Sequence, residues 1–443
     1  MNIQLSEHFT YRKLLRFVLP SIIMMIFTSI YSVVDGLFVS NFVGKSAFAA
    51  INLMMPFLMG ISALGFMIST GGSALVAKTL GEGKKEKANE YFSMLVYITL
   101  AGGLIIAILS AFAMRPVAII LGARGELLKN CVLYGRILCI SLTCFMLQNV
   151  FQSFFVAAEK PHLGLRVVVI AGVTNMLLDF LFVAVLHWGL AGAAIATVCG
   201  ELIGGIFPIF YFGHKNSSLL KLGKTHFYPK ILLKTCTNGS SELMTNLSSS
   251  LVNSLYNLQL MKFAGEDGVA AYGTIMYVNF IFAAIYFDYS IGSAPLVSYH
   301  HGAANHDELK NLFHKSVRLI STWAISLFVL AQLIASPLAS LFVGYDPALF
   351  ELTRMGFRIY CFAFLINGFN IYGSAFFTAL NNGLLSALIS FLRTLVFQMA
   401  AILILPLIFG INGIWYSITV AELLTLCVTA TFIVRKRNTY HYF

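Results

Sequence analysis

Apolar stretches of about 20 residues recur along the whole chain, and each is long enough to cross the hydrocarbon core of a membrane as a helix. The chain has 443 residues, of which 58% are hydrophobic and only 11% are charged. These values lie outside the range of soluble domains. The sequence therefore predicts an all-α polytopic membrane protein with twelve transmembrane helices. The predicted spans are 17–40, 51–77, 91–113, 130–156, 166–186, 190–212, 235–262, 269–297, 312–336, 354–379, 386–408 and 411–434.

The basic residues indicate the orientation of these spans. Twelve crossings place both termini on one side, and 21 of the 29 Lys and Arg residues fall in or near the loops of that side. Short cytoplasmic loops are enriched in Lys and Arg, so we expect both termini to be cytoplasmic. The net charge of +11 then reflects topology, and we expect no nucleic-acid partner.

An internal repeat divides the chain at a constant offset of 221 residues. The segment STGGSALVAKTLGEGKKEKANEYF from Ser69 aligns without a gap on SIGSAPLVSYHHGAANHDELKNLF from Ser290. We predict two six-helix bundles related by a pseudo-two-fold axis along the membrane normal. Residues 1–212 form an N-lobe, 213–229 a cytoplasmic linker and 230–443 a C-lobe. Duplicated bundles of this kind hold their cargo at the interface and alternate access between the two sides.

One carboxylate, Asp35, lies inside the first span. Thr28, Tyr31, Ser32 and Asp35 recur at helical spacing and form one polar stripe. An aspartate in a membrane helix costs several kcal/mol unless it serves a function or is paired structurally. We expect the stripe to face other helices or a wet cavity.

The two halves differ where oxygen-bearing side chains lie. Asp35 corresponds to Tyr256, and Thr197 corresponds to Ile418. Asn175 and Asp179 share one helix face, and they correspond to Val396 and Ala400. Asp35, Asp179 and Thr197 each lie roughly 8–12 Å inside the outer ends of their spans. Together with Asn175 they could bind Na⁺ through hard oxygen ligands, or the two carboxylates could carry a proton. The sequence leaves both coupling ions open.

Other polar residues within the spans are candidates for a cavity wall or a relay. They are Tyr31, Ser32, Glu201, Asn253, Tyr256 and Asp288. Glu201 recurs as Glu422, which favours a packing or gating role over ion binding. Arg393 lies near a helix end, and we expect it to extend toward the membrane interface.

Signals of catalysis are weak. No G-x-S-x-G motif, P-loop or dinucleotide fingerprint occurs, and the His300, His301 and His306 cluster is too small for a membrane di-iron enzyme. We expect neither enzymatic activity nor a cofactor other than the coupling ion.

Three stretches resemble one family. They are VVDGLFVSNFVGKSAFAAINLMMPF from Val33, LGEGKKEKANEYF from Leu80 with its repeat YHHGAANHDELKNLF, and HWGLAGAAIATVCGE from His187. These residues resemble the multidrug and toxic compound extrusion (MATE) transporters, most closely their bacterial DinF-like and MepA-like branch, over nearly the whole chain.

The resemblance implies two six-helix lobes around a central cleft in the bacterial plasma membrane. It implies export of amphipathic, often cationic drugs or dyes in exchange for Na⁺ or H⁺, with Asp35, Asn175, Asp179 and Thr197 at the matching ion site. We expect a monomer in contact with membrane lipids. Acids typical of a second cation site are missing from the tenth span, and a mid-helix proline is missing from the first. Alternatives are a lipid-linked saccharide flippase of the same superfamily and a membrane-embedded enzyme.

Overall fold

The computed structural model describes residues 3–443, apart from the side chains of Ser32, Val33, Gly36, Leu37, Ser40, Asn41 and Lys45. All regular secondary structure in the described chain is helical. The elements are α1 (Tyr11–Phe38), η1 (Val39–Val43), α2 (Lys45–Gly81), α3 (Lys85–Ile120), α4 (Gly125–Ala157), α5 (Pro161–Asp179), η2 (Phe180–Val185), α6 (Gly189–Gly213), α7 (Pro229–Gly302), α8 (His306–Val343), α9 (Pro347–Tyr360), η3 (Cys361–Leu365), α10 (Asn367–Ala379), α11 (Gly383–Phe391), η4 (Leu392–Phe397), α12 (Gln398–Phe409) and α13 (Ile411–Tyr440).

These helices confirm the predicted all-α membrane fold. Eleven described helical stretches are long and apolar enough to cross a membrane. One of them, α7, has 74 residues and contains a non-helical break at Gly265, with φ +62°. The break separates two crossings, so the number of spans is twelve. Gly44, its counterpart in the repeat, has φ +109° between η1 and α2. Both positions require the left-handed backbone that glycine adopts at low cost.

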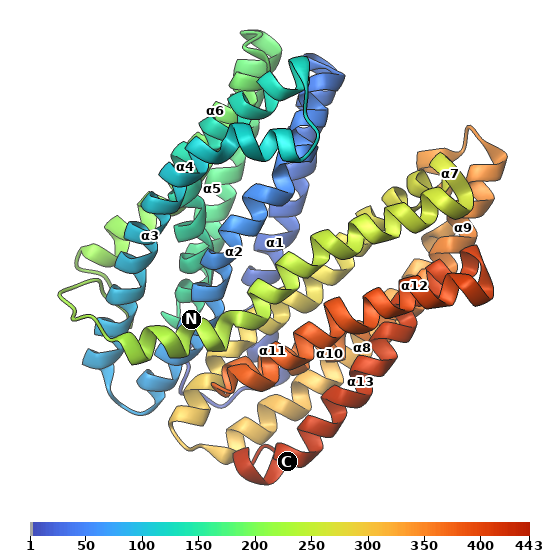
Figure 1. Cartoon of the computed structure of the whole chain (residues 1–443). Coiled ribbons are helices and arrows are strands. Elements are labelled where there is room, and N and C mark those ends of the chain that lie inside the picture. The colour runs from blue at the N-terminus through green and yellow to red at the C-terminus, as the bar shows by residue number, and fades with distance from the viewer. Residues whose placement is uncertain (1–2) are drawn as a thin grey trace.

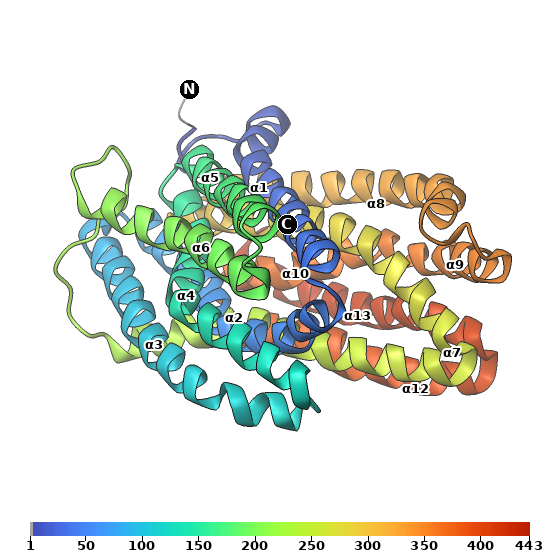
Figure 2. The ribbon, with the colours of Figure 1, turned by 90° about the horizontal axis from the view of Figure 1, so that it is seen from above.

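The two halves form two arms that meet at one end of the molecule and diverge toward the other (Figure 1). Helices α1 to α6 make one arm, and α7 to α13 make the other. Both chain termini lie at the end where the arms meet, which we call the terminal end. Seen from above, α1 and α2 lie beside the C-terminal half (Figure 2).

Glycines bring the two arms together at the terminal end. A β-carbon on Gly71 would lie 2.2 Å from the carbonyl oxygen of Thr235, and one on Gly239 would lie 1.9 Å from that of Met67. No larger residue fits at either position. Small residues allow membrane helices to approach closely, because packing rather than the hydrophobic effect drives their association. These contacts join α2 to α7 across the seam.

A short segment before α1 also spans the seam. The backbone N–H of Leu5 donates to Glu159 in the α4–α5 connection, at 2.6 Å. The N–H of Phe9 donates to Glu308 on α8, at 2.8 Å. Residues 5–9, here called the N-terminal strap, therefore tie the N-lobe to the C-lobe.

The apolar core of the N-lobe is divided into two clusters. One lies toward the terminal end and includes Phe92 and Phe154. The other lies toward the opposite end and includes Met54 and Leu190. Between them along the helices come polar side chains, namely Ser62 on α2, Ser141 on α4, Asn175 on α5 and Glu201 on α6. This polar layer holds the candidate site.

Candidate ion-coupling site

Asp35 and Asp179 come together where α1 packs on α5. Asp35 precedes the π-helix η1 by four residues, and Asp179 directly precedes the π-helix η2. The two π-helices also contact each other. Single π-turns interrupt the regular hydrogen-bond ladder of a helix and occur often at functional sites. Both carboxylates therefore lie at irregular points of otherwise regular membrane helices.

The carboxyl groups of Asp35 and Asp179 lie within hydrogen-bonding reach of each other. Asp179 is fully buried, and Asp35 is only 9% exposed. Oδ1 of Asp35 and both oxygens of Asp179 receive no hydrogen bond from the described residues. No basic side chain is among the described groups that act on either carboxyl. Two adjacent buried carboxylates repel each other, so the pair requires a shared proton or a bound cation.

Asn175 lies one helical turn before Asp179 on α5. It is 4% exposed, and neither of its polar side-chain atoms has a hydrogen-bond partner among the described residues. A buried amide without partners is costly, which is a reason to expect a ligand there. Thr197 on α6 is half-buried, and its hydroxyl donates to the carbonyl of Ala193 in its own helix at 3.1 Å. The side chain of Ser32 lies outside the described residues.

Helix α4 contributes residues that the sequence analysis missed. The buried hydroxyl of Tyr134 has no hydrogen-bond partner among the described residues and lies near three carboxyl groups, those of Asp35, Asp179 and Glu201. Ser141 donates to Oε2 of Glu201 at 2.5 Å. The run of polar residues on α4 between Ser141 and Ser153 could have indicated Ser141, but no sequence signal indicates Tyr134.

Tyr31 links the acidic residues to the same helix. Its hydroxyl lies beside the side chains of Thr28 and Gln148 and near the carboxyl groups of Asp35 and Glu201. A β-carbon on Gly204 would lie 2.3 Å from Oε1 of Gln148, so Gly204 makes room for this amide. Tyr31 and Glu201 thus belong to the surroundings of the aspartate pair.

The remaining candidates lie in the C-lobe. Tyr256 is buried and stacks on Tyr272, with 5.1 Å between ring centroids. Tyr272 in turn donates to Oδ1 of Asn253 at 2.9 Å. Asp288 is 9% exposed, and its Oδ2 has no partner among the described residues. In the repeat, Tyr256 thus takes the place of Asp35, and Ala400 takes the place of Asp179.

Arg393 does not extend to the membrane interface, so that expectation was wrong. Its Nε donates to Oε1 of Glu422 at 2.8 Å. Asn370 donates to Oε2 of the same carboxylate at 2.7 Å. Glu422 is buried, and its carboxylate is the ion-pair partner of Arg393 that the sequence did not reveal. Glu201, in the equivalent place, has Ser141 as its partner instead.

A small cavity lies beside this ion pair. It has a volume of about 10 Å³ and is lined by Arg393, Glu242, Ser374 and Ser390, among others. A cavity of this size and polarity accommodates one water molecule. The buried carboxylate Glu422 of the C-lobe thus has a basic partner, whereas the aspartate pair of the N-lobe has none among the described residues.

Comparisons with known proteins agree with this architecture. The profile of the MatE family matches residues 20–181 and 243–404, once in each half. The chain is 22% identical over 430 residues to the multidrug export protein MepA of Staphylococcus saprophyticus, covering 96% of this chain and 93% of that protein. It is 24% identical over 432 residues to MepA of Staphylococcus haemolyticus, covering 97% and 94%.

Solved structures share the fold. A structure described as the outward-facing conformation of a multidrug resistance MATE family transporter superposes with a TM-score of 0.92, at 22% identity, covering 98% of this chain and 97% of that one. A MATE structure in complex with MaL6 gives 0.93 at 21% identity, covering 98% of each. The profile matches cover more than half of the chain, and they fall on both arms. The chain therefore belongs to the MatE family of membrane transporters.

Proposed function

We propose that this protein is a secondary active multidrug efflux transporter that exchanges a cation, H⁺ or Na⁺, for amphipathic and often cationic compounds. The single observation that supports coupling is the buried pair of Asp35 and Asp179, which has no basic partner among the described residues. The relatives named as multidrug export proteins support the class of cargo.

The distribution of basic residues supports an orientation with the terminal end in the cytoplasm of a bacterial cell. The arms meet at that end and diverge toward the other. With this orientation, the close contact between the lobes on the cytoplasmic side supports an outward-facing conformation. An ion from outside then reaches the aspartate pair before cargo binds from the cytoplasm.

In the proposed mechanism, the coupling ion and the cationic drug both interact with the same pair of carboxylates. Binding of one Na⁺ or one proton between the carboxylates compensates one of their two negative charges, and Asn175 supplies a further oxygen ligand when the ion is Na⁺. The bound cation relieves the repulsion between the two carboxylates of α1 and α5, and it weakens their attraction for a cationic drug. A ligand shifts a conformational equilibrium only through its different affinity for the two states. The π-helices next to the two aspartates interrupt the regular hydrogen bonding of α1 and α5, so we expect these helices to rearrange there.

The test is ethidium efflux from proteoliposomes that contain the purified protein, with a Na⁺ gradient and a pH gradient imposed separately. Asp35→Asn and Asp179→Asn are expected to abolish efflux under the driving gradient. Asp267→Asn is the matched control, because Asp267 is exposed near the break in α7. Retained efflux in both aspartate variants would refute the coupling role.

The same assay separates the alternatives. A lipid-linked saccharide flippase would need free basic residues in the membrane interior to bind pyrophosphate. Arg393 is paired with Glu422 and is not free for that role. If neither gradient drove efflux while a lipid-linked saccharide crossed the membrane, the flippase function would replace the proposed one. Product formation without sealed vesicles would indicate an enzyme.

A further inference from the structure

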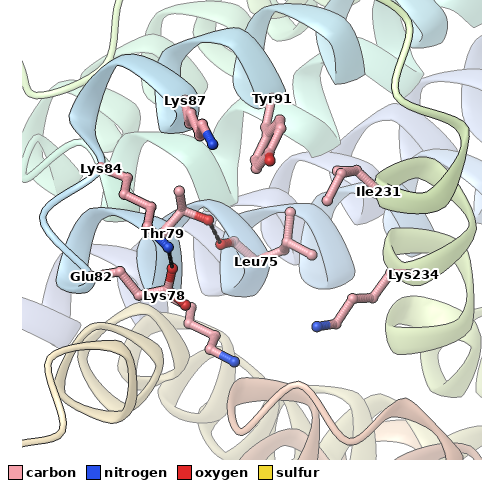
Figure 3. A pocket seen from close by; sticks show the side chains of 9 residues that line it. All are labelled: Leu75, Lys78, Thr79, Glu82, Lys84, Lys87, Tyr91, Ile231 and Lys234. Carbon is pink, nitrogen blue, oxygen red and sulfur yellow. Dashed lines mark hydrogen bonds and ion pairs between the residues drawn. The ribbon is translucent and has the colours of Figure 1, made fainter.

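A pocket opens at the terminal end between the last turn of α2, the first turns of α3 and the first turns of α7. Its volume is about 160 Å³, and four of its lining residues are lysines: Lys78, Lys84, Lys87 and Lys234. Figure 3 shows Lys78 and Lys234 extending toward each other from α2 and α7, with Lys87 entering from α3. The pocket therefore lies across the seam, with cationic side chains from both lobes.

Three of these four lysines form no ion pair with the described residues. Lys84 pairs with Glu82 at 2.8 Å. Lys78, Lys87 and Lys234 make no hydrogen bond or ion pair with the described residues, and Lys78 and Lys234 are close enough to repel each other. The carboxylate of Glu90, one turn after Lys87, is already bonded to the hydroxyl of Tyr228. Glu82 is the one carboxylate among the described residues that line the pocket, so the four lysines leave the pocket with a net positive charge.

The start of α3 adds further donors. This helix of 36 residues begins at Lys85, and no side chain caps its first turn. Unpaired N–H groups and the positive end of the helix dipole make such a terminus favourable for an anion. The first turns of α3 therefore lie at the same cavity as the lysine side chains.

The second copy of the repeat shows that the fold does not require these lysines. Lys78 corresponds to Tyr299, and Lys87 corresponds to Glu308. In the C-lobe, Glu308 accepts hydrogen bonds from the backbone of Phe9 and, at 2.5 Å, from the ring of His8. The N-terminal strap binds at that position. The lysines that α2 and α3 contribute to the pocket thus have no basic counterparts in the second copy of the repeat.

We propose that this pocket binds a phosphate-bearing anion between Lys78, Lys87 and Lys234. Phosphate oxygens accept hydrogen bonds from several ammonium and backbone N–H groups at once. The source is either the headgroup of an anionic phospholipid or a free phosphate. Because Lys234 belongs to the C-lobe and the other two lysines to the N-lobe, the bound anion stabilises the closed terminal end.

The test uses full-length protein in nanodiscs of phosphatidylcholine. One arm adds phosphatidylglycerol to the bilayer, and the other adds inorganic phosphate to the buffer. Anion binding is measured as an increase in melting temperature and by native mass spectrometry. Lys78→Gln/Lys234→Gln is expected to weaken binding at least about tenfold, which corresponds to about 1.4 kcal/mol. A response to phosphatidylglycerol alone identifies a lipid site, and a response to inorganic phosphate identifies a soluble ligand.

The matched control is Lys215→Gln/Lys310→Gln, which removes two exposed charges outside the pocket. It is expected to leave binding unchanged. If the pocket variant binds both probes as the wild type does, or the control loses as much binding, the proposal is wrong. Lys87→Gln, at an exposed position, is expected to weaken anion binding as well. If the double variant is poorly folded, unchanged anion binding by Lys87→Gln would refute the proposal.

Discussion

Gly81 packs against the backbone carbonyl of Tyr299, so closely that a β-carbon on Gly81 would lie 2.0 Å from that oxygen. The same contact recurs with the lobes exchanged, because a β-carbon on Gly302 would lie 2.1 Å from the carbonyl oxygen of Lys78. These two pairs are related by the 221-residue repeat. The terminal end is therefore closed by two equivalent contacts around the pseudo-two-fold axis, as in an isologous interface.

Gly81→Val and Gly302→Val are expected to prevent this closure. Each side chain would collide with backbone, which cannot move aside as a flexible side chain can. The conformational equilibrium should shift toward a state that is open at the terminal end, and ethidium efflux should fall at least about tenfold. Electron paramagnetic resonance distances between spin labels on α2 and α7 would report the opening.

Gly102→Val provides the control for these variants. Gly102 lies within α3, and nothing lies within 4 Å of a β-carbon built there. Its distance distribution and efflux should match those of the wild type. Unchanged distances in Gly81→Val would show that the glycine contact does not hold the lobes together.

Apolar periodicity and charge placement were enough to predict the twelve spans, because a bilayer requires long helices with few charges. The repeat predicted the two-fold relation. Contacts between helices were harder to predict from the sequence, because they depend on how closely two backbones approach and on residues that are far apart in the chain. Asp35 and Asp179 could be proposed as partners from their depth and their loss in the C-lobe. Tyr134 and the Arg393–Glu422 pair could not be predicted, because helix spacing alone does not define which helices pack against α4 or against α13.

The role of Asn175 distinguishes the two coupling ions. Its amide is buried without partners, and an oxygen ligand matters for Na⁺ but not for a proton on the aspartates. Asn175→Ala is therefore expected to abolish efflux driven by Na⁺ while largely retaining efflux driven by a pH gradient. Vesicle assays with each gradient imposed alone would measure this. Equal loss under both gradients would assign Asn175 to folding or to cargo binding.

Breaking the Arg393–Glu422 pair is expected to destabilise the protein strongly. Arg393→Met leaves the carboxylate of Glu422 buried without its charge partner, and such a loss costs about 3–5 kcal/mol. The double variant Arg393→Met/Glu422→Gln should recover much of this stability, because no uncompensated charge remains. Thermal unfolding in detergent would compare the three proteins. Arg354→Met breaks an exposed pair with Glu351, and it should cost less than about 1 kcal/mol.

The N-terminal strap is expected to detach when Glu308 is removed. This carboxylate accepts the N–H of Phe9 and contacts the ring of His8, and hydrogen bonds to charged groups contribute about 1.5–3 kcal/mol. In Glu308→Ala, hydrogen exchange of residues 5–9 should therefore accelerate at least about tenfold, since exchange reports local opening. Asp307→Ala is the matched control, because Asp307 is exposed in the same helical turn and has no ion pair among the described residues. Equal acceleration in both variants would mean that general damage to α8, rather than loss of the strap contact, releases the segment.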